Sequence, residues 1–339
     1  MRIDSLTQFV TEILMKLGVP PGPADIVADA IVAADIEGIP SHGVMLVPMY
    51  VDRMLAGSVS TRTEPSVVHD GGSAIVLDAG NALGQLTSDW AIPMVIERAR
   101  DHGLAAVAVR NGFHFGTAGY WARQIAEAGL AGIVMCNTRP LMPAPGGAER
   151  VVGNNPVAIA LPGNFVVDMA TSATAMGKIR LAESAGQPIP EGWAADEEGR
   201  PTTDPAAAIA GMLLPAAGPK GFGLAAAIDL LCGGLSGGAT GYEVAPLYGD
   251  PAKPYRCSHL FLAIDPARFG ISDLPQRVDK FATRIRASKR APGTERVYAP
   301  GDLERARRAA SAGECPLTPD LLSKLKECAA KVGVERELA

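Results

Sequence analysis

The chain has 339 residues, of which 47% are hydrophobic and 20% are charged. This length exceeds the size at which one hydrophobic core usually stops growing, so we expect two or three subdomains. The net charge of -5 and the pI near 5.6 argue against nucleic acid or an anionic membrane as the main partner.

The five cysteines are widely separated, and no Cys-x-x-Cys or Cys/His metal-binding spacing joins them. This pattern predicts reduced thiols in a reducing compartment, and no metal site. No apolar run approaches the roughly 18 residues needed to span a bilayer. Residues 1–5 lead into an amphipathic helix rather than into the apolar region of a signal peptide. We therefore expect a cytoplasmic protein without a membrane partner.

Three helices are expected near the N-terminus. Apolar residues at helical spacing predict the first over residues 6–17, and a second apolar stripe covers residues 26–36. A third helix is expected over residues 44–55 and opens directly after His42. This position predicts that the helix dipole lowers the pKa of His42 and favours the neutral imidazole.

The pattern then changes to short apolar runs that alternate with helices. Strands are predicted over residues 74–78, 104–109 and 131–136, with helices over residues 86–100 and 117–128 between them. Two further runs, residues 157–161 and 165–168, flank the loop Pro162-Gly163-Asn164. A three-residue loop of this kind is typical of a hairpin, so this pair is expected to be antiparallel. A doubly wound sheet would have needed a crossover helix there.

The second half of the chain is expected to hold fewer regular elements. Residues 177–215 are rich in proline and glycine and are expected to form a loop. Residues 221–235 predict a buried apolar helix, and residues 259–264 predict a late strand. Closing helices are expected near residues 302–312 and 319–332. The helices at the two ends of the chain are expected to pack together.

Two of the five histidines lie beside glycine at the ends of predicted elements. His114 lies in Gly112-Phe113-His114-Phe115-Gly116, and His42 lies in Ser41-His42-Gly43. Glycine adds no side-chain bulk, so backbone and imidazole can approach a small ligand closely. Both rings are candidates for proton transfer at neutral pH, although a satisfied loop histidine is the commoner occurrence.

Other candidate binding residues follow strand and helix ends. Residues 221–226 match the pattern G-x-G-x-x-A, but Gly218-Pro219-Lys220 precedes them instead of a strand, so a Rossmann site is not expected. Lys220 could hold a phosphate beside exposed backbone N–H groups, or it is a solvent-facing loop lysine. Arg139 suits a planar carboxylate, or it is a surface arginine before a proline loop.

Taken in order, these motifs resemble the malate/L-lactate dehydrogenase family, which is distinct from the Rossmann-type lactate dehydrogenases, and within it a hydroxycarboxylate dehydrogenase-like subgroup. The segments that carry the resemblance are Ser41-His42-Gly43, His114-Phe115-Gly116, Gly153-Asn154-Asn155-Pro156, residues 168–172, Gly177-Lys178, residues 188–193, Thr202-Thr203-Asp204-Pro205, Lys220-Gly221 and Pro300-Gly301-Asp302.

The resemblance implies an α/β (α+β) fold with a non-Rossmann cofactor domain on a mainly antiparallel sheet. It also implies a homodimer with active sites near the subunit interface. The domains expected are a helical subdomain of residues 1–58 with 300–339, a small α/β subdomain of residues 59–115, and an NAD(P)-binding domain of residues 116–299.

The resemblance implies the site residues as well. His42 is the first candidate for the acid/base, with Ser41 orienting it or the substrate. His114 is the second candidate, because family members differ in which histidine is credited. Contacts with NAD or NADP are implied for Asn155, Asp168, Met169, Ala170, Thr171, Ser172, Lys178, Lys220, Gly221, Gly301 and Asp302.

One position departs from the pattern of many relatives, which read Ser-His-Gly-x-x-Arg where this chain has Leu46. The resembling subgroup also has an apolar residue there. We expect Arg139 to bind the substrate carboxylate instead, and Leu46 to leave room for a larger or more apolar substrate side chain.

The chain is therefore expected to interconvert a 2-hydroxy acid and a 2-oxo acid with NAD or NADP. One alternative is a reductase of cyclic imino acids (piperideine- or pyrroline-2-carboxylate), which uses the same cofactor but protonates nitrogen. Lys178 favours the hydroxy acid, because ketimine-reducing relatives can carry Asp at that position. A second alternative is a catalytically silent cofactor-binding protein, against which the presence of both His42 and His114 argues.

Overall fold

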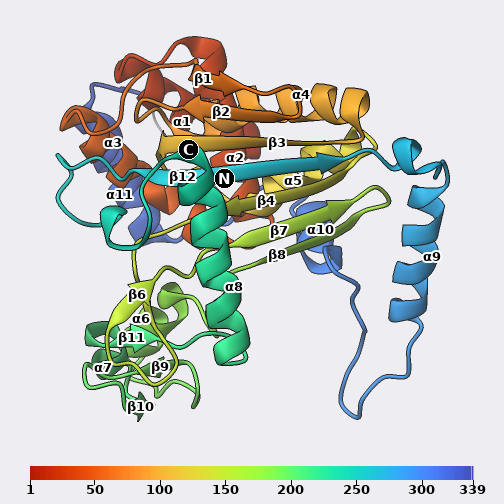
Figure 1. Cartoon of the computed structure of the whole chain (residues 1–339). Helices are drawn as coiled ribbons and strands as arrows, with labels where there is room; N and C mark the ends of the chain where they lie inside the picture. Colours follow the sequence, from red (N-terminus) through yellow and green to blue (C-terminus); the bar gives the residue numbers. More distant parts are fainter. Residues whose placement is uncertain (337, 339) are drawn as a thin grey trace.

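A seven-stranded sheet forms the centre of the protein in the computed structural model, which describes residues 1–336 and 338 (Figure 1). Its strand order is β1-β2-β3-β12-β4-β7-β8, and β2 and β3 form its one parallel pair. The strands are β1 (Ser66–Asp70), β2 (Ala74–Asp78), β3 (Leu104–Gly112), β4 (Ala131–Cys136), β7 (Val157–Leu161), β8 (Phe165–Met169) and β12 (Cys257–Ile264). The mainly antiparallel α/β fold is confirmed, as is the hairpin, in which Val157 lies opposite Met169.

Helices cover the two faces of this sheet unequally. One face is covered by α1 (Ile3–Lys16), α2 (Pro21–Ile36), α4 (Gly84–His102) and α5 (Ala118–Glu127), and the other by α8 (Pro219–Asp229) with the π-helical turn Leu230–Gly234. Alternation along β12 separates the faces, because Phe261 joins the large core whereas Leu260 packs with Ile228 of α8. Within the described part of the chain, no helix combines the length and the apolar character needed to cross a membrane.

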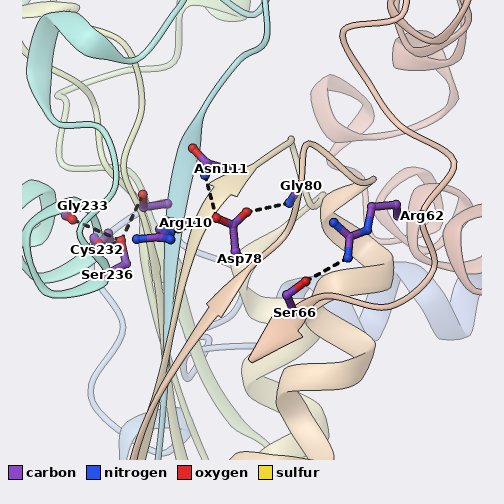
Figure 2. Close-up of polar contacts among 10 residues, drawn as sticks. Arg62, Ser66, Asp78, Gly80, Arg110, Asn111, Cys232, Gly233 and Ser236 are labelled. Atoms are coloured by element: carbon purple, nitrogen blue, oxygen red, sulfur yellow. Dashed lines mark hydrogen bonds and ion pairs between the residues drawn. The ribbon is translucent and has the colours of Figure 1, made fainter. Parts of the chain in front are cut away.

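The apolar helix predicted over residues 221–235 is not buried as expected. Ile228 and Cys232 pack on the sheet, but Leu230 and Leu235 remain 64% and 61% exposed. One side of the helix contacts the sheet, so the opposite side stays at the surface. Figure 2 shows the end of the π-helical turn, where the Ser236 hydroxyl donates to the Cys232 carbonyl at 2.7 Å.

The segment predicted as a loop over residues 177–215 instead folds into a small lobe, which lies at the lower left in Figure 1. The lobe contains α6 (Met176–Ser184), α7 (Pro205–Ala210) and the short strands β9 (Ala194–Ala195), β10 (Pro201–Thr202) and β11 (Met212–Leu213), and the pair β5 (Met142–Pro143) and β6 (Arg150–Val152) packs beside it. Its core includes Met142, Ile179 and Leu213. Two-residue strands are too short to show an alternating pattern, so periodicity did not predict them.

The two ends of the chain lie together. The Ile3 N–H donates to the Gly313 carbonyl, and the Cys315 N–H donates to the Met1 carbonyl. In addition, α11 (Pro319–Lys331) contacts α3 (Val47–Leu55), and α10 (Asp302–Ala310) contacts α2. α3 begins later than expected, because two short 3-10 turns, Pro40–His42 and Val44–Leu46, precede it. The domain boundaries given above stay predictions.

Asp78 fixes the carboxyl ends of the parallel strands β2 and β3 (Figure 2). Its carboxylate accepts hydrogen bonds from Arg110 Nε at 2.9 Å, Asn111 Nδ2 at 3.0 Å and the Gly80 N–H at 2.9 Å. These partners together hold the pKa of Asp78 below its ordinary value, against the opposing effect of burial. The contacts join the end of β2 to the last residues of β3, shortly before His114 in the sequence.

The buried carboxylate of Asp302 fixes the start of α10. It accepts hydrogen bonds from Arg286 at 2.8 and 2.9 Å, from the Ala299 N–H at 2.8 Å, and from Arg305. Arg286 ends α9 (Leu274–Arg286), so the ion pair joins α9 to α10 across the extended segment between them. The Arg286 hydrogen bonds lower the pKa of Asp302 from 3.8 to about 2.

We predict that Asp302→Asn lowers the free energy of unfolding by about 2 kcal/mol at pH 7, because a pKa lowered from 3.8 to about 2 corresponds to roughly that energy. The folded pKa lies below the unfolded one, so this stability is present above pH 3.8 and is lost as the pH falls towards 2. Denaturant unfolding without cofactor measures it. Asp320→Asn, in the exposed pair with Lys324, is the matched control and should change stability little. Equal losses of unfolding free energy in the two variants would contradict the stabilising role given to the Asp302 ion pairs.

Candidate active site

His42 ends the 3-10 turn Pro40–His42 and is half-buried. Its Nδ1 lies 3.0 Å from the Ser41 hydroxyl. Desolvation by the surrounding protein lowers the pKa of His42 to about 4, so the ring is neutral at pH 7. The expected direction of the shift is confirmed, but the expected cause is wrong. α3 begins only at Val47, and a helix dipole acts within its first turn.

His114 lies in the turn between β3 and α5. Its Nδ1 lies 2.7 Å from the Tyr50 hydroxyl and accepts a hydrogen bond from the Gly116 N–H at 3.3 Å. A backbone N–H can only donate, so Nδ1 carries a lone pair and the proton of the neutral ring lies on Nε2. Gly116 adopts a φ of +84°, a left-handed conformation that glycine tolerates without steric cost.

The two histidine rings face each other with centroids 5.4 Å apart. Desolvation holds the pKa of His114 well below its ordinary value, and the neighbouring His42 and His259 add to the effect. Each ring therefore has a partner at Nδ1 and is neutral at pH 7, which leaves Nε2 as the remaining polar atom of each. Nε2 is therefore the ring atom that each histidine can offer to a ligand.

Tyr50 and Gln85 are site residues that the sequence pattern did not reveal. Both are fully buried, and Gln85 Nε2 donates to the Tyr50 hydroxyl at 3.0 Å. Tyr50 lies on the buried stripe of α3, so the sequence assigns it to the core. Its hydroxyl nevertheless meets His114 across 64 positions of sequence. The feature of the sequence that could have indicated Tyr50 is its polar hydroxyl on a helix face that is otherwise apolar.

A first group of expected cofactor residues surrounds a cavity of about 840 Å³. Asp168 and Gly301 line it, together with Thr117, Arg123 and Arg308. The Gly119 N–H, in the first turn of α5, donates to Asp168 at 2.7 Å. Desolvation raises the pKa of Asp168 to about 6 despite this hydrogen bond.

A second group lies around the N-terminus of α8. The Ala216 N–H donates to the Thr171 carbonyl, and Ser172 forms a bridge with Pro215, so residues 171–172 lie against the segment that enters α8. A Cβ at Gly221 would lie 2.1 Å from the Ala216 carbonyl, so only glycine fits there. Lys220 is exposed in the first turn of the helix. The backbone N–H groups of the first turn of α8 and the Lys220 ammonium can bind a phosphate, and Gly221 lets it approach the backbone closely. These residues therefore fit the phosphates of a dinucleotide.

Asn155 is a buried residue that supports this second group. It is fully buried, and its side chain accepts from the Thr138 N–H at 2.8 Å and donates to the Ala225 carbonyl at 2.9 Å. It therefore joins the end of β4 to α8. Its side chain is occupied by protein contacts, which make it a positioning residue in this structure.

The remaining expected cofactor residues are dispersed. Met169 is exposed and Ala170 half-buried at the end of β8, and Lys178 is exposed in the first turn of α6, within the small lobe. The carboxylate of Asp302 lies among Arg286, Arg305 and the Ala299 N–H. A contact between any of these residues and a cofactor stays a prediction.

The two expected substrate residues differ in their setting. Arg139 is half-buried, and burial, followed by the neighbouring Arg150 and Arg180, lowers its pKa. None of the ion pairs within residues 1–336 and 338 involves Arg139. A guanidinium in a positive setting without a carboxylate is suited to an anionic ligand. Leu46, by contrast, is 1% exposed and belongs to the large core.

Comparison with known proteins places this chain in a family. The family model for malate/L-lactate dehydrogenase matches residues 1–326. The chain belongs to the malate/L-lactate dehydrogenase family. It is 36% identical over 336 residues to an L-sulfolactate dehydrogenase of Methanocaldococcus jannaschii, covering 97% of this chain and 96% of that protein. The solved structure of a sulfolactate dehydrogenase from that organism superposes with a TM-score of 0.93 at 35% identity, covering 98% of this chain and 97% of the other.

Two further relatives differ in cofactor. An NAD(+) ureidoglycolate dehydrogenase of Escherichia coli is 37% identical over 303 residues, covering 88% of this chain and 86% of that protein. An NADP(+) (2R)-3-sulfolactate dehydrogenase of Chromohalobacter salexigens is 37% identical over 288 residues, covering 84% and 86%. Family membership makes the chain an NAD(P)-dependent oxidoreductase of the hydroxyacid dehydrogenase type.

We predict that neutral His114 carries its proton on Nε2, because the Gly116 N–H requires a lone pair on Nδ1. Long-range ¹H–¹⁵N spectra distinguish the two tautomers, and the His114→Gln variant identifies the signal by its disappearance. A proton on Nδ1 at pH 7 would show that the Gly116 hydrogen bond does not form in solution.

Proposed function

We propose that the chain interconverts a 2-hydroxy acid and a 2-oxo acid, with His42 and His114 acting together on the substrate oxygen. The observation that supports this proposal is the pair of facing neutral imidazoles, centroids 5.4 Å apart, each held at Nδ1 by a protein partner. A bound NAD(P) supplies or accepts the hydride at the substrate carbon, and a protein side chain must donate or accept one proton at the substrate oxygen.

We assign that proton to His42. The Ser41 hydroxyl at its Nδ1 can either donate or accept, so the ring keeps a partner when neutral and when protonated. His114 lacks this freedom, because protonation of its Nδ1 would oppose the Gly116 N–H. His114 therefore donates from Nε2 and orients the substrate oxygen, while Tyr50 positions the ring.

The remaining expected residues are assigned to the cofactor and to the substrate carboxylate. The N-terminus of α8 with Lys220 suits the phosphates of the cofactor, and the cavity beside Asp168 and Gly301 provides room for another part of it. Arg139 is assigned to the substrate carboxylate, because it follows the end of β4, lies near Arg150 and Arg180, and forms no ion pair within residues 1–336 and 338. The homodimer implied by the family resemblance stays a prediction that light scattering of the full chain measures.

We predict that His42→Gln lowers kcat by about 10²- to 10⁴-fold, the usual contribution of a general acid or base. Nicotinamide absorbance with NADH and NADPH follows turnover of a panel of 2-oxo acids and of piperideine- and pyrroline-2-carboxylate. His69→Gln, an exposed histidine on β1, is the control and should retain full activity. His114→Gln should lose less in kcat than His42→Gln.

Three outcomes of this assay would contradict the proposal. Turnover confined to the cyclic imines would assign the chain to the ketimine reductases. Cofactor binding without turnover across the panel would indicate a catalytically silent protein. A larger loss in kcat for His114→Gln than for His42→Gln would exchange the roles of the two histidines.

We predict that His42 stays neutral from pH 8 down to pH 5, because desolvation lowers its pKa to about 4. A neutral ring is the form that accepts a proton, so oxidation of the hydroxy acid should not decline along an ordinary histidine titration. ¹⁵N spectra of His42 and the pH dependence of kcat/KM measure this. The raised pKa of Asp168, about 6, can add an inflection of its own, which Asp168→Asn should remove. Protonation of His42 near pH 6.5 would contradict the desolvation that lowers its pKa.

A further inference from the structure

Three side chains with nitrogen or sulfur ligand atoms meet where β4 ends and β12 begins, beside the turn that carries His114. Cys136 ends β4, and it lies directly opposite His259 of β12. Cys257 precedes His259 by two positions, so both project from the same face of β12. One ligand atom from each residue lies within 4.8 Å of the others, and Cys257 Sγ lies 3.4 Å from His259 Nε2.

Within the described residues, the Cys136 thiol donates to the Asn137 carbonyl at 3.0 Å, but the His259 ring lacks an adequate partner. Cys257 and His259 are fully buried, and Cys136 is 5% exposed. His259 Nε2 meets only a sulfur, a weak hydrogen-bond partner, and Nδ1 has no partner within the described residues. A buried polar ring without adequate partners costs stability, so a stronger interaction at these atoms would be favourable.

We propose that Cys136, Cys257 and His259 form a binding site for a soft divalent d¹⁰ cation of the Zn²⁺ class. Two thiolates and a neutral imidazole are a ligand set that Zn²⁺ and Cd²⁺ prefer, whereas Mg²⁺ and Ca²⁺ require oxygen ligands. Nothing in the hydride-transfer reaction uses these residues, so the proposal is independent of the proposed function.

Charge balance favours a divalent ion at this depth. Binding forms two metal–sulfur bonds and one metal–nitrogen bond, and each thiol releases one proton to solvent. The two thiolates then neutralise the two positive charges, so no net charge is buried. Three protein ligands leave one tetrahedral position for water or another small ligand.

The site is connected to the proposed catalytic turn through Phe115. The Phe115 ring stacks on His259 with centroids 4.3 Å apart and an interplanar angle of 3°. Phe115 adjoins His114, and its carbonyl accepts from Trp121 Nε1 at 2.8 Å. A cation on His259 would fix the ring and thereby stiffen the turn that carries His114.

Cd²⁺ titration of the full chain, reduced and free of metal, tests the proposal. We expect one Cd²⁺ per chain, a thiolate-to-metal charge-transfer band, and release of about two protons per ion. His259→Phe and Cys257→Ser should weaken binding by at least about 10- to 100-fold. His259→Phe keeps an aromatic ring against Phe115, so we expect this variant to fold. Circular dichroism before titration checks that it does.

Cys232→Ser is the matched control. Cys232 is equally buried but belongs to the cluster on the opposite face of the sheet, so its loss should leave the Cd²⁺ band and the stoichiometry unchanged. Undiminished Cd²⁺ affinity in folded His259→Phe, or an equal loss of affinity in Cys232→Ser, would overturn the site. Absence of any stoichiometric Cd²⁺ band in the wild-type chain would do the same and would indicate a purely packed core.

Discussion

The position of β12 between β3 and β4 is the constraint on which the rest of the structure depends. This strand comes from the last third of the chain, yet it forms antiparallel ladders with both neighbours. Its first residue, Cys257, pairs with Gly112, directly before the turn that carries His114. On the other side, Asn137 accepts from the Ser258 N–H at 2.7 Å and donates to Asp229 at 2.8 Å. One strand therefore aligns the His114 turn, the end of β4 and the helix α8.

Desolvation by the surrounding protein accounts for more of the pKa shifts at the proposed active site than neighbouring charges do. Desolvation is the first cause of the lowered pKa of both His42 and His114 and of the raised pKa of Asp168. Hydrogen bonds then distinguish the two rings. The Ser41 hydroxyl faces Nδ1 of His42, whereas Nδ1 of His114 faces both the Tyr50 hydroxyl and the Gly116 N–H. The roles proposed for the two histidines rest on that difference in partners.

Much of the fold was predictable because it depends on local pattern. The strands over residues 74–78 and 131–136, the hairpin loop at residues 162–164 and the closing helices agree with β2, β4, the β7–β8 turn, α10 and α11. The small lobe of residues 176–213 gave no periodic signal, because its strands are two residues long and its helix α6 buries only Ile179, so no apolar stripe marks it. Composition also misjudged α8, since an apolar helix need bury only the side that meets the sheet.

The sequence by itself determined which residues are candidates for the chemistry: His42, His114, Lys220 and the ordered family motifs are visible in a single chain. Only the tertiary structure decided which partners those residues have. The Tyr50–His114 contact spans 64 positions and the Cys136–Cys257–His259 cluster spans more than a hundred, so no spacing rule could place them. Strand pairing and desolvation arise when the chain packs, and these two effects set the tautomers, the pKa shifts and the proposed cation site.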